Sequence, residues 1–154
     1  MRDKTACMMR VKNEARWIQR SLERTFQVCQ TVVILDDGST DETALECMAS
    51  IAPNRSIDDQ HYGWVGMGES KHGTCMLHYI HSPFVSNLHP SNLRPGMRVS
   101  EIRDKNLLWE FCKANVPFQH MLCLDGDEWL SVDAIRNWPE AIGWLEREAD
   151  ILHL

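Results

Sequence analysis

The feature that most constrains the fold of this chain is a short apolar run that ends in acidic residues. Residues 121–124 (MLCL) are followed directly by Asp125, Gly126, Asp127 and Glu128. An apolar run of this length, bounded by a turn signal, is typical of a buried strand. Side chains two positions apart on an extended segment point the same way. We therefore expect Asp125 and Asp127 to converge at the carboxyl end of a strand.

A second apolar run, further upstream, ends in the same way. Residues 31–35 (TVVIL) lead into residues 36–42 (DDGSTDE). Ser39 and Glu42 have the spacing of a capping box, so this segment predicts a strand, a tight acidic loop and a helix. Two strands that both end in acids indicate one shared site along the edge of a parallel sheet, where open α/β sheets bind ligands.

The two aspartates at 125 and 127 need a positive partner if they lie close together, because like charges repel. Mg²⁺ or Mn²⁺ suits such a site, since hard cations take oxygen ligands and leave coordination positions for phosphate oxygens. The plainer interpretation is an acidic turn after a strand, and an isolated pair of this kind often matches by accident. The second acidic element favours the cation site.

Charge and length restrict the possible functions. The net charge is −6, and residues 123–154 carry the whole excess, with eight acids against two bases. A nucleic-acid surface would need a basic patch, so we expect no nucleic-acid partner. The chain has 154 residues and 44% hydrophobic content, enough for a core, and we expect residues 1–154 to form a single domain.

Cysteine usage and the chain ends bear on location. Six scattered cysteines without a C-x-x-C pair predict buried free thiols in a reducing compartment, so we expect a cytoplasmic protein. Residues 1–4 show no signal peptide, and no run approaches the ~20 apolar residues of a membrane span. The chain stops on residues 151–154 (ILHL), which have the pattern of a starting strand. We therefore expect a fragment that is incomplete at its C-terminus.

Strand and helix patterns alternate along the chain. We expect strands at Thr5–Val11, Thr31–Asp36 and 119–124, and helices at 14–29, 41–50, 100–115 and 139–149. Residues 54–99 are rich in Gly, His, Pro, Asn and Ser and predict a long loop. The alternation predicts an α/β fold with a Rossmann-like, mostly parallel sheet.

Three further patterns lie outside this scheme. Cys75, His78 and His81 have a spacing that zinc could use, but zinc sites usually show tighter pairs, and a His-rich loop is the simpler interpretation. Glycines at 63, 66, 68 and 73 surround Lys71, as in a phosphate-binding P-loop. A P-loop needs Lys followed by Ser or Thr, so we reject this interpretation. Arginines at 16, 20 and 24 lie on one predicted helix face, where they could face phosphates or form a solvated stripe.

Three segments together resemble the nucleotide-sugar half of a family 2 glycosyltransferase. They are residues 11–14 (VKNE), 34–43 (ILDDGSTDET) and 124–128 (LDGDE), which match that family in order and spacing as well as in residues. The resemblance implies a GT-A fold, which is a Rossmann-like α/β/α sandwich. It also implies transfer of a sugar from a nucleoside diphosphate sugar, expected to be UDP-linked, to an acceptor that the sequence does not identify.

The same resemblance implies a role for each matching residue. Asp36 or Asp37 would receive the nucleobase and ribose, and Glu14 would line the same pocket. Asp125 would face the ribose or the water shell of the metal. Asp127 would ligate Mn²⁺ or Mg²⁺ directly, so that the metal neutralises the diphosphate as it leaves. Glu128 would orient this set or serve as an acid at a helix N-terminus.

Arg103 is a further candidate for nucleotide binding. The segment 102–106 (IRDKN) resembles the Arg-and-Asn helix that precedes the acidic motif in family 2 enzymes, although the family has Arg and Asn adjacent and here two residues separate them. Arg103 would then contact a nucleotide phosphate or the base edge. The alternative is a surface ion pair between Arg103 and its neighbour Asp104.

The catalytic residue and two alternative functions remain open. An inverting transferase needs a general base, and no residue after Glu128 has a pattern that identifies one. A nucleotidyltransferase of similar fold would carry a Gly-rich, basic signature near the first strand, which residues 11–14 lack. A non-catalytic nucleotide- or metal-binding module would fit a truncated chain.

Overall fold

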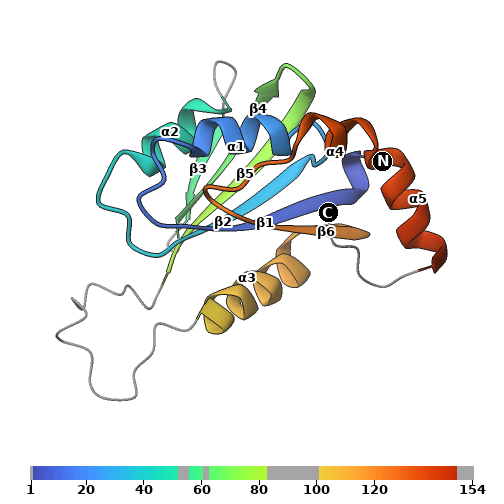
Figure 1. The fold of residues 1–154 in the computed structure, drawn as a ribbon. Helices are drawn as coiled ribbons and strands as arrows, with labels where there is room; N and C mark the ends of the chain where they lie inside the picture. Colours follow the sequence, from blue (N-terminus) through green and yellow to red (C-terminus); the bar gives the residue numbers. More distant parts are fainter. Residues whose placement is uncertain (1, 52–55, 61–62, 83–100, 149–154) are drawn as a thin grey trace.

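The computed structural model of the chain describes residues 2–51, 56–60, 63–82 and 101–148. One six-stranded sheet crosses this part of the chain, in the order β3-β4-β5-β2-β1-β6 (Figure 1). Its strands are β1 (Thr5–Val11), β2 (Thr31–Asp36), β3 (Ser56–Gln60), β4 (Gly63–Ser70), β5 (Gly73–His81) and β6 (His120–Asp125). The helices are the 3₁₀ turn η1 (Arg2–Lys4), α1 (Ile18–Thr25), α2 (Thr43–Ala49), α3 (Glu101–Asn115), α4 (Val132–Arg136) and α5 (Trp138–Glu148).

The sheet is mostly parallel. β1 pairs in parallel with β2 on one side and β6 on the other, and β2 pairs in parallel with β5. Only the β3–β4–β5 meander is antiparallel among the described strands. The registers Val11 with Asp36 and Arg10 with Asp125 bring the carboxyl ends of β1, β2 and β6 to the same edge. The α/β class and the Rossmann-like, mostly parallel sheet are thereby confirmed.

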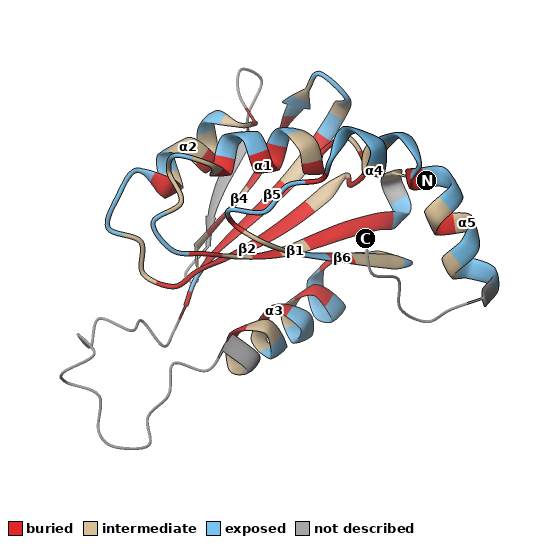
Figure 2. Cartoon of the chain, viewed as in Figure 1, coloured by how far each residue is buried: buried red, intermediate tan, exposed pale blue. Residues whose placement is uncertain are grey.

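Helices cover both faces of the sheet, which explains why its central strands are mostly apolar. In Figure 1, α1 and α2 lie on one face and α3 on the other. Alternate residues of β2 divide between two cores: Val32 and Ile34 join the cluster under α1, and Val33 and Leu35 join the cluster against α3. Figure 2 shows these strands as a buried layer between more exposed helices.

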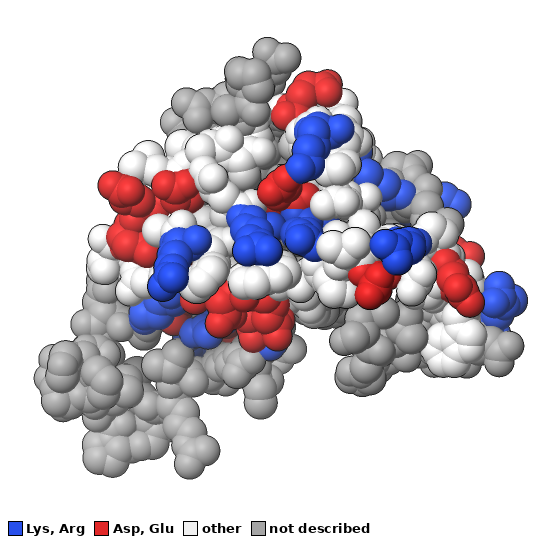
Figure 3. Space-filling model, turned by 45° about the horizontal axis from the view of Figure 1, so that its top comes forward, with Lys and Arg blue, Asp and Glu red and all other residues white. Residues whose placement is uncertain are grey.

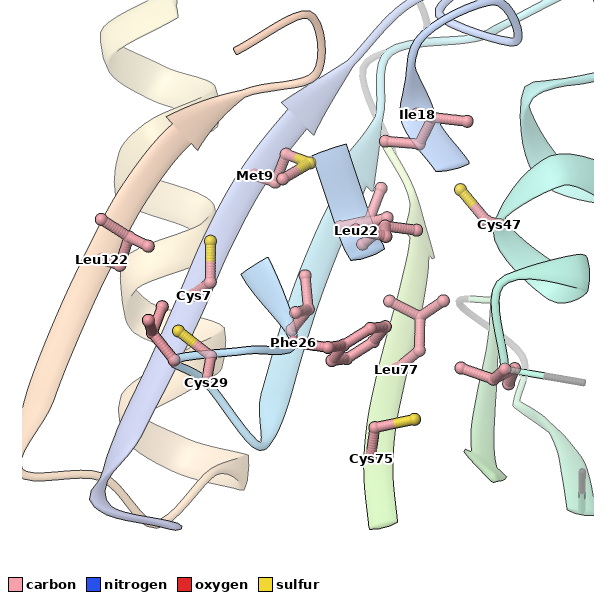
Figure 4. Close-up of a cluster of buried hydrophobic side chains, with 14 of the residues drawn as sticks. Cys7, Met9, Ile18, Leu22, Phe26, Cys29, Cys47, Cys75, Leu77 and Leu122 are labelled. Carbon is pink, nitrogen blue, oxygen red and sulfur yellow. The ribbon is translucent and has the colours of Figure 1, made fainter. Parts of the chain in front are cut away.

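The core under α1 is the larger of the two clusters. Met9 of β1 and Leu22 and Phe26 from the α1 segment lie together with Leu77 of β5 (Figure 4). Each of these four side chains is at most 1% exposed. Burying an aliphatic or aromatic side chain of this size contributes about 2 kcal/mol, so this packing fixes α1 across β1 and, with it, the loop that joins them.

The expectation of a long loop at residues 54–99 is wrong for the part of this region that the structure describes. β3, β4 and β5 occupy this region, with the two glycines Gly66 and Gly68 inside β4. A β-carbon at Gly66 would lie 2.3 Å from the Ile51 side chain, so the glycines serve close packing of β4 on the end of α2. Residues 83–99 of the expected loop, and the expected strand at 151–154, lie outside the described residues.

Several smaller expectations also need correction. The helix expected at 14–29 spans only Ile18–Thr25, and α4 was not expected. The capping box is wrong: α2 begins at Thr43, and its N-cap Glu42 makes no side-chain capping hydrogen bond. Ser39 instead donates its hydroxyl to Asp36 at 2.6 Å.

The cysteines are all free, as expected, and five are buried, whereas Cys123 is exposed. Burial raises the pKa of the Cys7 and Cys29 thiols well above the ordinary value, which keeps these groups protonated at neutral pH. Across the described ranges, no helix combines the length and the apolar character needed to cross a bilayer.

Candidate functional site

The candidate site lies where the sheet order reverses. From β1 the chain passes to β2 and later to β5 on one side, and it then places β6 on the opposite side of β1. The crevice at such a switch point, beyond the carboxyl ends of the strands, is where open α/β sheets bind ligands. The loops that follow β1 and β6 meet there, since the Gly126 N–H donates to the Arg10 carbonyl at 3.0 Å.

Gly126 is the residue that lets these two loops approach. A β-carbon at this position would lie 2.8 Å from Cγ1 of Val11 and 2.9 Å from Cγ of Glu14. Contacts this short do not occur between real side chains, so Val11 or Glu14 would have to move. The glycine between the two aspartates therefore has a steric role in the site.

The loops after β1 and β2 are joined by hydrogen bonds between two of the segments that carry the family resemblance. The Asn13 side-chain carbonyl accepts the Thr40 N–H at 2.8 Å, and the Asn13 N–H donates to Ser39 Oγ at 2.9 Å. The Glu14 N–H donates to Thr43 Oγ1 at 2.8 Å. Asn13 has φ of 57°, a left-handed conformation that asparagine tolerates better than most residues. Segments 11–14 and 36–43 thus form one unit.

Four carboxylates gather at this unit. The pKa of Glu14 is raised, first by burial and then by the negative charges of Asp127, Asp41 and Asp125. Asp41 is held in place by the Ala15 N–H at 3.1 Å and by the Thr43 hydroxyl at 2.5 Å. Burial alone would raise the pKa of Asp41, but these hydrogen bonds outweigh it and lower the value. The site is therefore strongly acidic, and the crowding of negative charge disfavours the ionised form of Glu14.

Asp36 is buried at the end of β2 with both oxygens in use. Its Oδ1 accepts the Ser39 N–H at 2.8 Å and the Ser39 hydroxyl, and its Oδ2 accepts the Tyr79 hydroxyl at 2.8 Å. His81 Nδ1 lies 4.0 Å from the same Oδ2. Burial and the neighbouring Asp36 charge raise the pKa of Tyr79, so its hydroxyl stays a donor. Tyr79 was missed because it lies in the region expected to be a loop, and His81 was considered only as a zinc ligand.

Asp37 is buried and belongs to an ion-pair network with Arg10 and Asp104. Arg10 donates to Asp37 at 2.8 Å through Nη2 and to Asp104 at 3.1 Å through Nε. Lys12 Nζ lies 3.5 Å from Asp37. Arg103 pairs with Asp104 at 3.2 Å, which is the neighbour ion pair considered as the alternative for this arginine. Arg10 and Asp104 were missed, since an arginine inside a strand and an aspartate inside a helix carry no distinctive sequence signal.

The two aspartates of the 125–128 motif are arranged differently from the expectation. Asp125 ends β6, and residues 126–127 form a turn, so the assumption of an extended segment is wrong at Asp127. Asp125 lies 3.6 Å from Lys105 Nζ, and its N–H donates to Glu128 Oε2 at 2.8 Å. Glu128 thus orients the motif, as considered, and it does not begin a helix. Asp127 is exposed.

The residues present are compatible with a divalent cation, although the protein alone does not complete a coordination sphere. Within the described ranges, no group of three or more His, Cys, Asp or Glu side chains is placed to hold a metal. Mg²⁺ usually takes only one or two protein carboxylates and fills its remaining positions with water and substrate phosphates. Asp125 and Asp127, both near Glu14, are the donors that fit this pattern.

The zinc arrangement considered for Cys75, His78 and His81 is not formed. All three lie on β5, where successive side chains point to opposite faces. Cys75 is buried in the core cluster under α1, and the His78 ring contacts Phe111 of α3 on the other face.

Comparison of the chain with models of known protein families finds no match, and a search among curated proteins finds no similar sequence. The candidate site therefore rests on its own residues and geometry.

The crowding around Glu14 gives a testable prediction. Replacing Glu14 with glutamine should raise the melting temperature at pH 7 by about 2 °C in metal-free buffer, because it removes one of four crowded negative charges. A carboxyl whose pKa is raised on folding makes the protein less stable as pH rises through the range above its ordinary value. The gain from Glu14→Gln should therefore develop as pH rises above the ordinary pKa of a glutamate and vanish below it.

The measurement is a series of thermal melts across this pH range. Glu140→Gln, at an exposed position of α5, is the matched control and should show no such pH-dependent gain. A Glu14→Gln protein that melts below the parent at pH 7 would show that the Glu14 carboxylate stabilises the loops instead.

Proposed function

We propose that this chain is the donor-binding domain of a metal-dependent glycosyltransferase of the GT-A type, which moves a sugar from a UDP-linked donor to a hydroxyl acceptor. The observation that supports the proposal best is that the loops after β1, β2 and β6, each of which carries at least one carboxylate, meet at the switch point of the sheet. These loops contain the three segments that resemble family 2 glycosyltransferases. The free thiols support a reducing, cytoplasmic location.

In this proposal the loop after β2 receives the uridine. Asp36 is fixed by Tyr79 and Ser39, and Asp37 is fixed by Arg10, so neither carboxylate has to reorganise when a nucleotide arrives. Such preorganised acceptors suit the imide N–H of uracil and the ribose hydroxyls. Glu14, joined to the same loop through Thr43, lines the side of the pocket.

The loop after β6 would hold the metal and the diphosphate. Asp125 and Asp127 would supply carboxylate oxygens to Mn²⁺ or Mg²⁺, and the bound metal would neutralise charge on the departing diphosphate. Lys105, 3.6 Å from Asp125, and Arg103, on the same helix, are cations that could contact phosphate oxygens. No residue among the described ones is assigned as the general base.

The test measures nucleotide affinity with and without metal. UDP with Mn²⁺ should stabilise the parent protein more than ADP or GDP does, in thermal-shift and titration experiments. Asp127→Asn should weaken Mn²⁺-dependent UDP binding tenfold or more, which corresponds to about 1.4 kcal/mol. The exposed Asp133, on α4, gives the matched control Asp133→Asn, which should bind UDP as the parent does.

Two results would count against the proposal. Equal UDP affinity in the parent and in Asp127→Asn would show that the metal does not bind at this motif. Equal stabilisation by all nucleoside diphosphates would show that the β2 loop does not recognise uridine. Hydrolysis of a UDP-sugar in the presence of Mn²⁺ separates an enzyme from the alternative of a non-catalytic nucleotide-binding module, which would bind UDP without turnover.

A further inference from the structure

A second concave surface lies along the outer face of α1. This groove has a volume of about 920 Å³, and its walls come from α1, the end of α2, the turn between β4 and β5, and α4. Three arginines of the α1 segment, Arg16, Arg20 and Arg24, line it together with Lys71 of the turn. Nothing in the proposed donor site uses these residues.

The arginines are held in position by aromatic rings and a backbone carbonyl. The Arg16 guanidinium lies 4.5 Å from the centre of the Trp17 ring, and Arg20 lies 5.0 Å from the centre of the Trp129 ring. Arg24 donates to the Leu130 carbonyl at 3.3 Å. Among the described residues, none of the three forms an ion pair. Their charges are therefore available to a ligand, and their side chains lose little freedom when one binds.

The groove is a positive region on a negative protein. Its lining includes four Lys and Arg residues against two glutamates, Glu23 and Glu69, whereas the whole chain has a net charge of −6. Figure 3 shows basic side chains gathered near the middle of the face that carries α1, with acidic side chains around them. Arginine is the residue best suited to bind carboxylates and phosphates through paired hydrogen bonds. The ligand that this surface favours is an anion.

The spacing of the arginines matches an extended peptide. Arg20 and Arg24 lie four residues apart on α1, which separates them by about 6 Å along its axis, and Arg16 lies in the turn just before α1. Alternate side chains of an extended peptide are about 6.7 Å apart and point the same way. Two acidic residues at alternate positions would therefore meet Arg20 and Arg24, and Arg16 would be available to a further acidic residue.

The remaining polar groups of the groove favour a peptide over a phosphate chain. Glu69 is an acceptor, Glu23 is paired with Lys71, and Gln19 and Gln27 are both donors and acceptors. A peptide backbone offers N–H and C=O groups to such a mixed lining, whereas a nucleic-acid backbone offers acceptors alone. We propose that this groove binds an extended acidic segment of a partner protein, with carboxylates at alternate positions on Arg20 and Arg24 and a further one on Arg16.

The experiment measures fluorescence anisotropy of a fluorescein-labelled decapeptide of alternating Asp and Ser. The parent protein should bind it saturably, and the affinity should fall as salt rises. Arg20→Glu and, separately, Arg16→Glu should each weaken binding at least tenfold while melting as the parent does, because both side chains are exposed. Lys113→Glu, at an exposed position of α3 on the opposite face, is the matched control and should bind the peptide normally.

A second probe tests the class of ligand. A labelled six-nucleotide oligo-dT, whose five phosphates match the five aspartates of the peptide, should bind more weakly than the peptide. Tighter binding of the oligonucleotide would overturn the assignment in favour of nucleic acid. The proposal also fails if the peptide shows no saturation below about 1 mM, or if both arginine variants bind it as the parent does. None of these outcomes depends on whether the chain binds UDP.

Discussion

Replacing Gly68 with alanine should lower the free energy of unfolding by about 3 kcal/mol, at the upper end of the usual cost of overpacking a core. A β-carbon at this position would lie 2.1 Å from the Ile51 carbonyl oxygen and 3.1 Å from its carbonyl carbon. Both are backbone atoms, and the Ile51 side chain is fully buried, so no flexible group can move aside. Relief requires that β4 and the end of α2 separate, which opens the core under α1.

The measurement is denaturant unfolding of the parent and the variant, with equal m-values as the check that both unfold in the same way. Gly143→Ala is the matched control. Its β-carbon would meet only Arg147 Nη1, at 3.4 Å, and alanine is favoured over glycine inside a helix by about 1 kcal/mol. Gly143→Ala should therefore be neutral or more stable. A Gly68→Ala protein as stable as the parent would show that β4 is not packed against Ile51 in this way.

This packing explains why the β3–β5 region was not predicted. Glycines are uncommon inside strands, so a segment with glycines at 63, 66 and 68 has the composition of a loop. Their function depends on Ile51, an α2 neighbour whose contact with β4 no local pattern can indicate. By contrast, β1 and β2 have the expected bounds, because a strand covered on both faces is a continuous apolar run that is visible in the sequence alone.

The candidate site likewise contains residues that could be predicted from the sequence and residues that could not. The acidic residues at the ends of β2 and β6 could be predicted, since each follows an apolar strand in a local pattern. Their partners could not, because Tyr79 reaches Asp36 from β5 and Asp104 reaches Arg10 from α3. These contacts depend on strand order and on which helix covers which face. The turn at Asp127 was not predicted for a simpler reason. The chain was assumed to stay extended from Asp125 to Asp127, whereas the strand ends at Asp125.

Replacing Asp104 with alanine should also destabilise the fold by about 3 kcal/mol, since removing one partner of a buried ion pair leaves the other uncompensated. Asp104 has no exposed surface and accepts hydrogen bonds from both Arg10 and Arg103. The cost should lie at the low end for a buried pair, because Arg10 is 22% exposed and keeps its bond to Asp37. Asp104→Asn should cost less, as the amide oxygen can still accept one of these hydrogen bonds.

Denaturant unfolding measures this cost, and Asp133→Ala is the control, because the exposed Asp133–Arg136 pair should contribute little.

The Asp104 variants also test how the donor site is built. Arg10 bridges Asp104 and Asp37, so loss of Asp104 frees the guanidinium to rotate and loosens Asp37. If Asp37 contacts the nucleotide, Asp104→Asn should weaken UDP binding severalfold even at temperatures where the variant is fully folded. Unchanged UDP affinity in a folded Asp104→Asn protein would mean that Asp37 serves only the fold and that Asp36 alone receives the nucleotide.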